Sequence, residues 1–546
     1  MSEQPQLDLH SEKQTSDDES QSPPSPPNDV KSPAVPGLGW KFWVLFVTLC
    51  LSGFAVTMEG SIVVTALPTI ARDLHTTDYV WVVNCYTLAS AIFQPLVGWL
   101  AEAFGRKPLM LGSIVVFAVG SAMAGAANSL GLILAGRLIQ GIGGGAIPLI
   151  AELIISDLVP LEQRPQMLGM VMATSCLGLV FGPIIGGAIV DHSTWRWIFF
   201  LNLPLAGASL LCLFPVLGHR TTEQRSATTS LRATAKRFDW VGNTLLPASS
   251  VAILLPLTMG GENVSLGFGA VGFGVYEHYC PNPLIPLRLL RNPSAVSLQI
   301  QSFIQSMLIM WINYFLTIYF QAVLGVSPQQ AGFDLMPTIV AMVVFSIVGG
   351  VAMSKLPRSW AVLNNLIAFA IMSIGLGCFT ILTASSVTAV HVVLQIIVAG
   401  GNGLLLATLL PNIQGQFDSE DMTAVTALFN FLRSFALVWG MTIPSIIFDQ
   451  SVNRNLGLVP QELRPLLEGG GAYVRASKEF MQSFQGTTKD QILDLYELAL
   501  RDTWWGAMAF ALLGLLLVAL QRPGKPSTPS AEDPQQTEGE KEKAEA

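Results

Sequence analysis

The feature that most constrains this chain is a series of long apolar segments between residues 42 and 521. A helix rises about 1.5 Å per residue and the hydrocarbon core of a bilayer is about 30 Å thick, so a spanning helix needs roughly 20 mostly apolar residues. The sequence therefore predicts an all-α polytopic membrane protein with fourteen transmembrane helices. The predicted spans are 42–66, 80–101, 109–127, 131–154, 167–190, 198–217, 240–259, 265–280, 297–320, 331–353, 361–383, 389–410, 422–446 and 503–521.

Composition excludes a water-soluble chain. Of the 546 residues, 51% are hydrophobic and 12% are charged, whereas soluble proteins carry about 25% charged residues. The net charge of −8 comes mostly from the two ends: residues 1–39 hold seven acidic and two basic residues, and residues 522–546 hold six acidic and four basic. These two tails are predicted to be disordered, and the sequence shows no basic stripe for nucleic acid.

Cysteines and histidines do not form a cofactor site in the sequence. The six cysteines are scattered without a C-x-x-C pair and the six histidines are dispersed, so we expect neither a disulfide framework nor a metal site. The phosphate-binding pattern G-x-x-x-x-G-K-[ST] does not occur, which argues against direct use of ATP. A membrane enzyme is therefore disfavoured, and we expect no cofactor.

The distribution of lysine and arginine predicts the orientation of the chain, because short cytoplasmic loops are enriched in both residues. With the N-terminus inside, the inner loops hold twelve of them and the short outer loops hold only Arg72 and Arg196. Both tails are therefore predicted to be cytoplasmic, and 447–502 to be an extracellular loop. Within that loop, "KDQILDLYELALRD" (489–502) has helical apolar spacing and is expected to lie on the membrane surface. The inner-loop residues are Arg106, Lys107, Arg164, Arg220, Arg225, Arg232, Lys236, Arg237, Arg288, Arg291, Lys355 and Arg358.

A faint internal repeat predicts the domain organisation. Gly98-x-x-x-Glu102-x-x-x-Arg106 follows the second span, and Gly350 and Arg358 recur at the same spacing after the tenth. The repeat pairs the first six spans with the last six and leaves two spans as an insertion. The predicted regions are a disordered tail 1–39, a six-helix bundle 40–218, a cytoplasmic loop 219–239, an inserted helix pair 240–294, a second six-helix bundle 295–521 and a disordered tail 522–546.

Several motifs resemble one family of transporters. The segments are "GWLAEAFGRKP" (98–108), "AGRLIQGIGGGAIP" (135–148), "GLVFGPIIGG" (178–187), "MEGSIVVTALPTIARDL" (58–74) and "TWRWIFFLNLP" (194–204). They resemble signatures of the major facilitator superfamily, in particular its fourteen-helix drug:proton antiporter branch. The closest similarity is to fungal multidrug and secondary-metabolite (toxin) efflux pumps. Glu59 and Glu102 stand where the family usually has aspartate.

The resemblance implies proton-coupled efflux of amphipathic organic compounds such as drugs, toxins or secondary metabolites. The implied partners are a small organic substrate, protons and membrane lipids, and the implied state is a monomer in the plasma membrane. Uptake or vacuolar transport of small nutrients, amino acids or iron–siderophores remains an alternative, as does a non-transporting sensor with the same fold. The likeness of 178–187 to an antiporter signature favours export.

The loop after the second span is a candidate gating loop. Gly105 frees the backbone at a tight turn, and Arg106 and Lys107 can meet anionic headgroups. Glu102 lies four residues before Arg106 and can pair with it or contact a neighbouring helix in one state. With Gly98 at the signature spacing, we expect a role in conformational gating, against the alternative of a plain topogenic loop.

The candidate antiporter helix is rich in glycine. Gly178, Gly182 and Gly186 recur every four residues and form a smooth face that a second helix can approach closely. Pro183 removes a backbone hydrogen bond and kinks the helix, and Gly187 follows. We expect this face to act as a hinge between the two halves, against the alternative of ordinary small-residue packing.

Glu59 and Arg137 are the candidate proton-coupling residues. Glu59 lies roughly 26 Å along its helix from residue 42, and Arg137 lies roughly 9 Å from the outer end of its helix. Both therefore fall in the outer half of the membrane, where a charge tends to pair or to face a cavity. A substrate that disturbed such a pair would change its proton affinity; the alternative is a static ion pair. Gln140, one turn below Arg137, is expected to line the same cavity.

Other polar and aromatic residues in the apolar spans are candidates for the substrate cavity, although aromatic rings near an interface often serve as anchors. Arg433 is either functional or extends to the inner surface. Asp334 is the next acid to consider for coupling, and the sequon at Asn263 lies close to the membrane and is expected to be unused. The cavity candidates are Asn84, Gln94, Trp311, Asn313 and Tyr314, with Tyr319, Asn402 and Gln414 as weaker choices.

The charge asymmetry leads to a test of topology. An epitope tag at the N-terminus should be hidden from antibody on intact cells, and a tag inserted within 447–502 should be accessible, because the basic loops hold the opposite side in the cytoplasm. Antibody binding before and after permeabilisation measures both positions. An N-terminal tag that is exposed on intact cells would show that the orientation is inverted.

Overall fold

The computed structural model describes residues 40–159, 164–216, 291–356, 359–417 and 422–522. Within these ranges the regular structure is helical and contains no strand. The apolar segments form helices because a helix satisfies its own backbone hydrogen bonds, which lipid cannot do. The predicted tail 1–39, residues 523–546 of the other predicted tail, the loop 219–239 and the helix pair at 240–280 with Asn263 lie outside the described residues.

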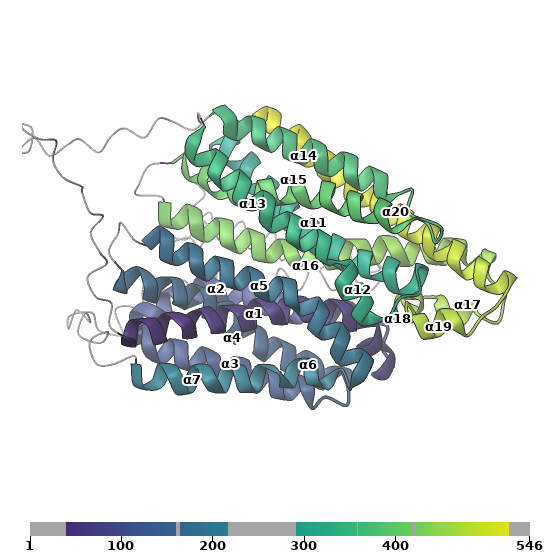
Figure 1. Ribbon diagram of the computed structural model, residues 1–546, viewed down its shortest axis with the longest axis horizontal. Helices are drawn as coiled ribbons and strands as arrows, with labels where there is room; N and C mark the ends of the chain where they lie inside the picture. The colour runs from purple at the N-terminus through teal and green to yellow at the C-terminus, as the bar shows by residue number, and fades with distance from the viewer. Residues whose placement is uncertain (1–39, 160–163, 217–290, 357–358, 418–421, 523–546) are drawn as a thin grey trace, which may run out of the picture.

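The first half of the chain forms one helical bundle, shown in purple to blue in Figure 1. A break at Leu201 divides its last span into two pieces. The helices are α1 (Trp40–Asp73), α2 (Tyr79–Phe104), α3 (Arg106–Gly125), α4 (Leu130–Leu158), α5 (Arg164–His192), α6 (Arg196–Phe200) and α7 (Asn202–Val216).

The second half forms another bundle, shown in teal to yellow. A π-helical turn, Tyr319–Val323, ends its first span, and short helices connect its last two spans. The helices are α11 (Pro293–Ile318), α12 (Pro328–Asp334), α13 (Met336–Lys355), α14 (Ser359–Phe379), α15 (Thr388–Gln414), α16 (Met422–Asn455), α17 (Arg464–Leu467), α18 (Gly471–Val474), α19 (Lys478–Gln482) and α20 (Thr487–Leu517), with 3₁₀ turns at Leu456–Leu458 and Val518–Leu520.

The two bundles lie side by side with their long helices roughly aligned (Figure 1). We call the end that holds Trp40 and Leu520 the terminal end, and the end that holds residues 456–486 the loop end. Each half packs in a corresponding way, with α1 on α5 and α3 on α4 in the first, and α11 on α16 and α14 on α15 in the second. Between the halves, α2 packs on α16 and α5 packs on α12.

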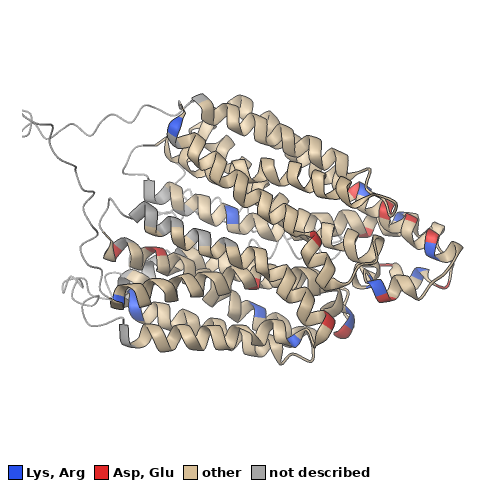
Figure 2. Cartoon of the chain, viewed as in Figure 1, with Lys and Arg blue, Asp and Glu red and all other residues tan. Residues whose placement is uncertain are grey.

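Ten of the described helices are long and apolar enough to cross a membrane, and α2 and α5 lie beside them in the first half. Figure 2 shows charged residues near the two ends of the helices and a bundle middle that is largely uncharged. Twelve of the fourteen predicted spans overlap helices that the structure describes. The other two, 240–259 and 265–280, lie outside the described ranges, so the total of fourteen stays a prediction.

The predicted membrane-surface segment 489–502 is different in the structure. It forms the first half of α20, a single helix that continues without a break to Leu517. Its apolar face, which includes Ile492 and Leu495, is fully buried against protein, and the Tyr496 hydroxyl donates a hydrogen bond to the Ala472 carbonyl. The prediction of a helix with one apolar face is therefore correct for 489–502. That face packs against the second bundle and not on the membrane surface.

The glycine face of α5 packs within the first half. A Cβ atom at Gly178 would overlap Thr57 and Phe54, one at Gly182 would overlap Ser61, and one at Gly186 would overlap the Ile62 carbonyl, all on α1. Hydroxyls of α1 also donate to α5, with Thr57 bonded to the Ser175 carbonyl at 2.7 Å. The predicted hinge face is thus mostly a close contact inside one bundle.

The two halves make close contacts at the loop end. Gly187 meets the backbone of Pro328, and Gly332 meets the backbone of Pro183, so α5 and α12 touch without intervening side chains. In addition, the ring of Tyr79 from α2 stacks on that of Tyr473 from α18, with ring centroids 3.7 Å apart. The structure is therefore closed between the halves at this end.

The close contact of α5 with α1 predicts the effect of a substitution. Gly182→Leu should lower the stability of the purified protein by about 3 kcal/mol, since an overpacked core typically costs 1–3 kcal/mol and here backbone atoms also have to move. Gly207→Leu in α7 is the matched control, because a Cβ there meets no atom within 4 Å. Thermal unfolding in detergent measures both variants. Equal unfolding temperatures for Gly182→Leu and the wild type would show that the contact is looser than described.

Candidate functional site

A central cavity of about 410 Å³ lies between the two halves. Four helices of the first half and four of the second contribute to its wall, which is mostly apolar with a few hydroxyl and amide groups. This volume is within the usual range of small-molecule sites. Its lining includes Thr57, Val64, Tyr86, Gln94, Pro148, Leu179, Ile309, Asn313, Met342, Leu406, Arg433 and Leu437.

A second chamber of about 390 Å³ continues from the central cavity and shares part of its wall. It adds Glu152 of α4, which lies about two turns beyond Gly145 toward the terminal end. Arg433 of α16 lines both chambers from the other half. The two chambers therefore contain one acidic and one basic side chain, Glu152 and Arg433, in a wall that is otherwise apolar or neutral polar.

Glu59 and Arg137 form a fully buried ion pair between α1 and α4. The Asn202 amide donates to the other Glu59 carboxylate oxygen. Arg137 also donates to the Val82 carbonyl at 2.9 Å and to the Gln140 side chain at 2.8 Å. Burial of two charges is tolerated only when both are paired and hydrogen-bonded, and this network meets that condition.

Tyr86 connects the ion pair to the cavity. Its side chain lines the cavity, whereas Glu59 and Arg137 are not among the lining residues, and the Arg137 guanidinium lies over the Tyr86 ring, 4.4 Å from the centroid. Such a cation–π contact is stronger when it is shielded from water. A molecule in the cavity can therefore touch the ring that contacts the arginine, without touching either charge.

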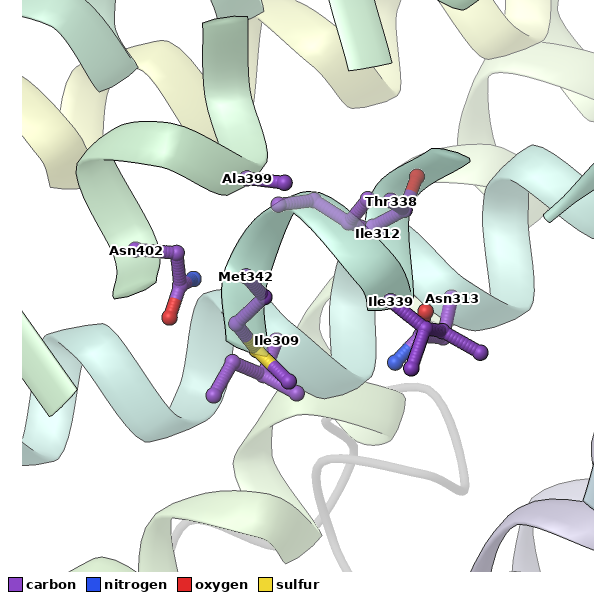
Figure 3. Close-up of a pocket in the computed structure, with 8 residues that line it drawn as sticks. All are labelled: Ile309, Ile312, Asn313, Thr338, Ile339, Met342, Ala399 and Asn402. Atoms are coloured by element: carbon purple, nitrogen blue, oxygen red, sulfur yellow. The ribbon is translucent and has the colours of Figure 1, made fainter. Parts of the chain in front are cut away.

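Two of the predicted cavity residues lie on the wall. Gln94 lines both chambers and accepts a hydrogen bond from Ser434 of the other half at 3.3 Å. Asn313 lines the central cavity and also a small side pocket of about 10 Å³ that contains Thr338 and Asn402 (Figure 3). A pocket of this volume holds about one water molecule, so the side pocket is too small for an organic substrate.

Other predicted cavity residues lie behind the wall. Gln140 is fully buried and bridges Arg137 to Ser121, donating to the latter at 2.7 Å. Asn84 donates to Thr442 of the second half at 2.8 Å. Trp311 packs against Phe510 inside the second bundle.

The remaining candidates make local contacts. The Tyr314 side chain is buried between the halves without lining the cavity. The Tyr319 hydroxyl donates to the Thr383 carbonyl at 3.0 Å, and Gln414 donates to Thr426 at 2.9 Å. Asp334 accepts a hydrogen bond from Gln330 within its own helix. Nearby hydrogen bonds therefore account for Tyr319, Gln414 and Asp334, whereas the buried Tyr314 hydroxyl has no hydrogen-bond partner among the described residues.

The predicted gating loop is a tight turn between α2 and α3. Gly105 has φ +86°, a left-handed backbone conformation that favours glycine. The Arg106 side chain pairs with Asp157 at the end of α4, at 3.0 Å, and Lys107 lies over the Phe214 ring. Gly98 and Glu102 lie in α2, where the Glu102 side chain is outside the described set. The described ion-pair partner of Arg106 is therefore on α4, and its guanidinium also donates a hydrogen bond to the Ala101 carbonyl of α2 at 3.1 Å.

Sequence reasoning missed three residues of the site. Asn202 lies in the motif at 194–204 and carries no further signal in the sequence, yet its side-chain amide donates a hydrogen bond to Glu59. Tyr86 lies in an apolar span with no signal beyond its ring. Glu152 had a clear signal, an acid inside the predicted span 131–154, because an ionisable residue within a membrane segment points to function.

A model of the Major Facilitator Superfamily matches residues 49–441. The chain belongs to the major facilitator superfamily. It is therefore a multi-pass membrane transporter and not an enzyme, as the motifs predicted.

Relatives within this superfamily align along most of the chain. The MFS efflux transporter aclA of Aspergillus oryzae is 40% identical over 504 residues, which cover 89% of this chain and 90% of that protein. The Acurin A biosynthesis cluster MFS-type transporter of Aspergillus aculeatus is 38% identical over the same coverage. Among solved structures, a bacterial homologue of the human lysosomal transporter Spinster, in an inward-facing and unoccupied conformation, matches with a TM-score of 0.62 and 15% identity, over 90% of this chain and 100% of that one. This last likeness shows the fold alone.

The buried ion pair of this major facilitator protein predicts unequal effects of two substitutions. Arg137→Ala should destabilise the protein by about 3–5 kcal/mol, since it leaves a buried carboxylate without its charged partner. Glu59→Gln should cost less, because the amide can still accept from Asn202. Thermal unfolding in detergent compares the two. A larger loss for Glu59→Gln than for Arg137→Ala would contradict the pairing described.

Proposed function

We propose that this transporter exports amphipathic organic compounds in exchange for protons. The observation that carries the proposal is the placement of the Glu59–Arg137 pair directly behind Tyr86, a cavity-lining ring. An antiporter needs a titratable group that responds to the substrate without being exposed to it, and this arrangement supplies one.

The character of the cavity supports an amphipathic substrate. Its wall is mostly aliphatic, and polar contacts come from side chains such as Ser90, Gln94 and Asn313. Apolar walls with a few placed polar groups suit ligands whose binding comes from buried apolar surface. Secondary metabolites and drugs with one polar group and a large apolar body fit this description.

The direction of transport is inferred from the relatives. The protein from Aspergillus oryzae is named as an efflux transporter, and the one from Aspergillus aculeatus belongs to a biosynthesis cluster. Both names favour export over the alternatives of nutrient uptake or sensing. Export from the cell requires that the transporter lie in the plasma membrane. One chain contains the whole central cavity, so a monomer is sufficient for transport.

The coupling step follows from the geometry of the pair. When Glu59 holds a proton, its carboxyl is neutral and its attraction to Arg137 is weak. A substrate that presses on the Tyr86 ring restrains Arg137, which then pairs with Glu59 as the proton leaves. One proton is released for each substrate that enters, and the state described here, with the pair formed, corresponds to the proton-free form.

Removal of the titratable group should abolish coupling. We expect Glu59→Gln to lose export driven by a proton gradient, whereas exchange of substrate without a gradient continues, because glutamine keeps the shape but cannot release a proton. Glu59→Asp should retain partial activity. Export from proteoliposomes, with and without an imposed pH difference, measures this for a panel of fungal toxins and fluorescent dyes.

The matched control is Glu479→Gln, which changes an exposed glutamate at the loop end that lies 3.8 Å from Arg72. It should export like the wild type. Full gradient-driven export by Glu59→Gln would place coupling at another residue, and export by the wild type that is indifferent to the gradient would remove proton antiport altogether.

A further inference from the structure

Glu152 is an acidic side chain that the proposed coupling mechanism does not use. It lies within the membrane-crossing part of α4, Leu130–Ile155, where it is half-buried. Its side chain lines the second chamber between the halves. A charge at such a depth is costly, and it usually marks a path for a substrate or an ion. Glu152 therefore calls for a function of its own.

The direction of the Glu152 side chain follows from its place on α4. Gly145, Pro148 and Glu152 recur at i, i+3 and i+7, which is the spacing of one helix face, and all three line the second chamber. Gly145 lacks a side chain that could cover this face, because a Cβ there would overlap Ser90 of α2. The Glu152 carboxylate is thus presented to the chamber by the same face that forms its wall.

No residue of the described chain neutralises this carboxylate. The ion pairs among the described residues involve other acids, namely Asp73, Glu479, Asp157 and Glu59. Arg433 lines the same chamber from the second half, but it has an interaction of its own and is not paired with Glu152. The negative charge is therefore the one that the chamber leaves for a ligand.

An aromatic ring accompanies the carboxylate in the second chamber. Phe431 of α16 is part of the wall, and its ring stacks on that of Phe435, with centroids 5.9 Å apart and an interplanar angle of 9°. This stacking fixes the position of the Phe431 ring. Positively charged nitrogen groups bind well to aromatic rings, so a carboxylate and a phenyl ring in one chamber suit an organic cation.

The second chamber is continuous with the central cavity. Thr57, Gln94, Pro148 and Leu437 line both, whereas Glu152 and Phe431 line only the second chamber. The central cavity has the more apolar wall. One elongated molecule can therefore place a polar end in the second chamber and an apolar body in the central cavity.

Resting on the export proposed above, we propose that the second chamber binds a positively charged nitrogen group of the substrate, with Glu152 as its counter-ion and Phe431 as its aromatic contact. The apolar body of the same molecule lies in the central cavity. The transporter then prefers cationic amphiphiles to neutral compounds of the same shape. Under the predicted topology the terminal end faces the cytoplasm, so Glu152 lies on the side from which an exported compound enters.

A pair of fluorescent probes that differ only in charge tests this preference. The first probe is a dansyl group linked through an ethyl chain to trimethylammonium, and the second is its neutral isostere, in which carbon replaces the quaternary nitrogen. Fluorescence titration of the purified full-length protein gives a Kd for each probe, after subtraction of the signal from protein-free micelles. Because neither probe releases a proton, the measurement does not depend on coupling.

We expect the wild type to bind the cationic probe about tenfold more tightly than the isostere, since desolvation of the two charges offsets much of their attraction. Glu152→Gln should abolish this preference by raising the Kd of the cation about tenfold, and Glu152→Asp should retain part of it. Phe431→Leu should weaken binding of the cation about threefold. Glu479→Gln, which removes an exposed carboxylate at the loop end, is the matched control and should keep the full preference.

The neutral isostere also reports on folding, because its Kd should be the same in Glu152→Gln and in the wild type. A wild type that binds both probes equally, or binds neither, overturns the cation site. So does a Glu152→Gln variant that retains the preference. A general loss of binding of both probes in Glu152→Gln, with Glu152→Asp no better, likewise overturns it, because the residue would then be structural.

Gradient-driven export from proteoliposomes separates this inference from the proposed function. Glu59→Gln should lose export of both probes and keep the tighter binding of the cation, whereas Glu152→Gln should continue to export the neutral isostere. If Glu59→Gln keeps gradient-driven export, the proposed coupling fails while the cation site stands on its binding data. If Glu152→Gln loses gradient-driven export of the isostere, Glu152 belongs to coupling and the cation site is overturned.

Discussion

The buried ion pair between Glu59 and Arg137 is the interaction on which the first half depends. Two charges in a medium of low dielectric must be paired and fully hydrogen-bonded, and here the partners come from five helices. Glu59 lies on α1, Val82 on α2, Ser121 on α3, Gln140 on α4 and Asn202 at the start of α7, and one connected network joins them to Arg137. The remaining long helix, α5, is held by its glycine contact with α1.

The second half is organised differently. Several of its buried hydrogen bonds join neutral groups, such as Gln305 with Asn402 and Asn364 with Thr408. Neutral hydrogen bonds fix the packing of α11, α14 and α15 but offer nothing to titrate. Under the proton exchange proposed above, the buried titratable pair belongs to the first half, whereas both halves line the substrate cavity.

Sequence reasoning reached the helices and the ion pair, because both follow from one-dimensional rules. Counting the rise per residue placed Glu59 and Arg137 at one depth, and they are in contact. Gln140 was assigned to the cavity, yet residues three apart share a helix face, so it turns with Arg137 into the network. Asn202 and Tyr86 could not be found in this way, since their roles depend on which helices become neighbours. The same limit applies to α20, whose apolar face could have covered either lipid or protein.

The 456–486 segment is joined covalently to the second half through α16 and α20, yet α18 rests on α1 of the first. The segment therefore bridges the two bundles, and the ring of Tyr473 stacks on that of Tyr79 of the first half. Any motion that separates the halves at the loop end has to break this contact of the 456–486 segment once per transport cycle. A molecule that held the 456–486 segment against the first half would stop transport without competing with the substrate for the cavity. Inhibition at this contact would therefore not depend on which compound is exported.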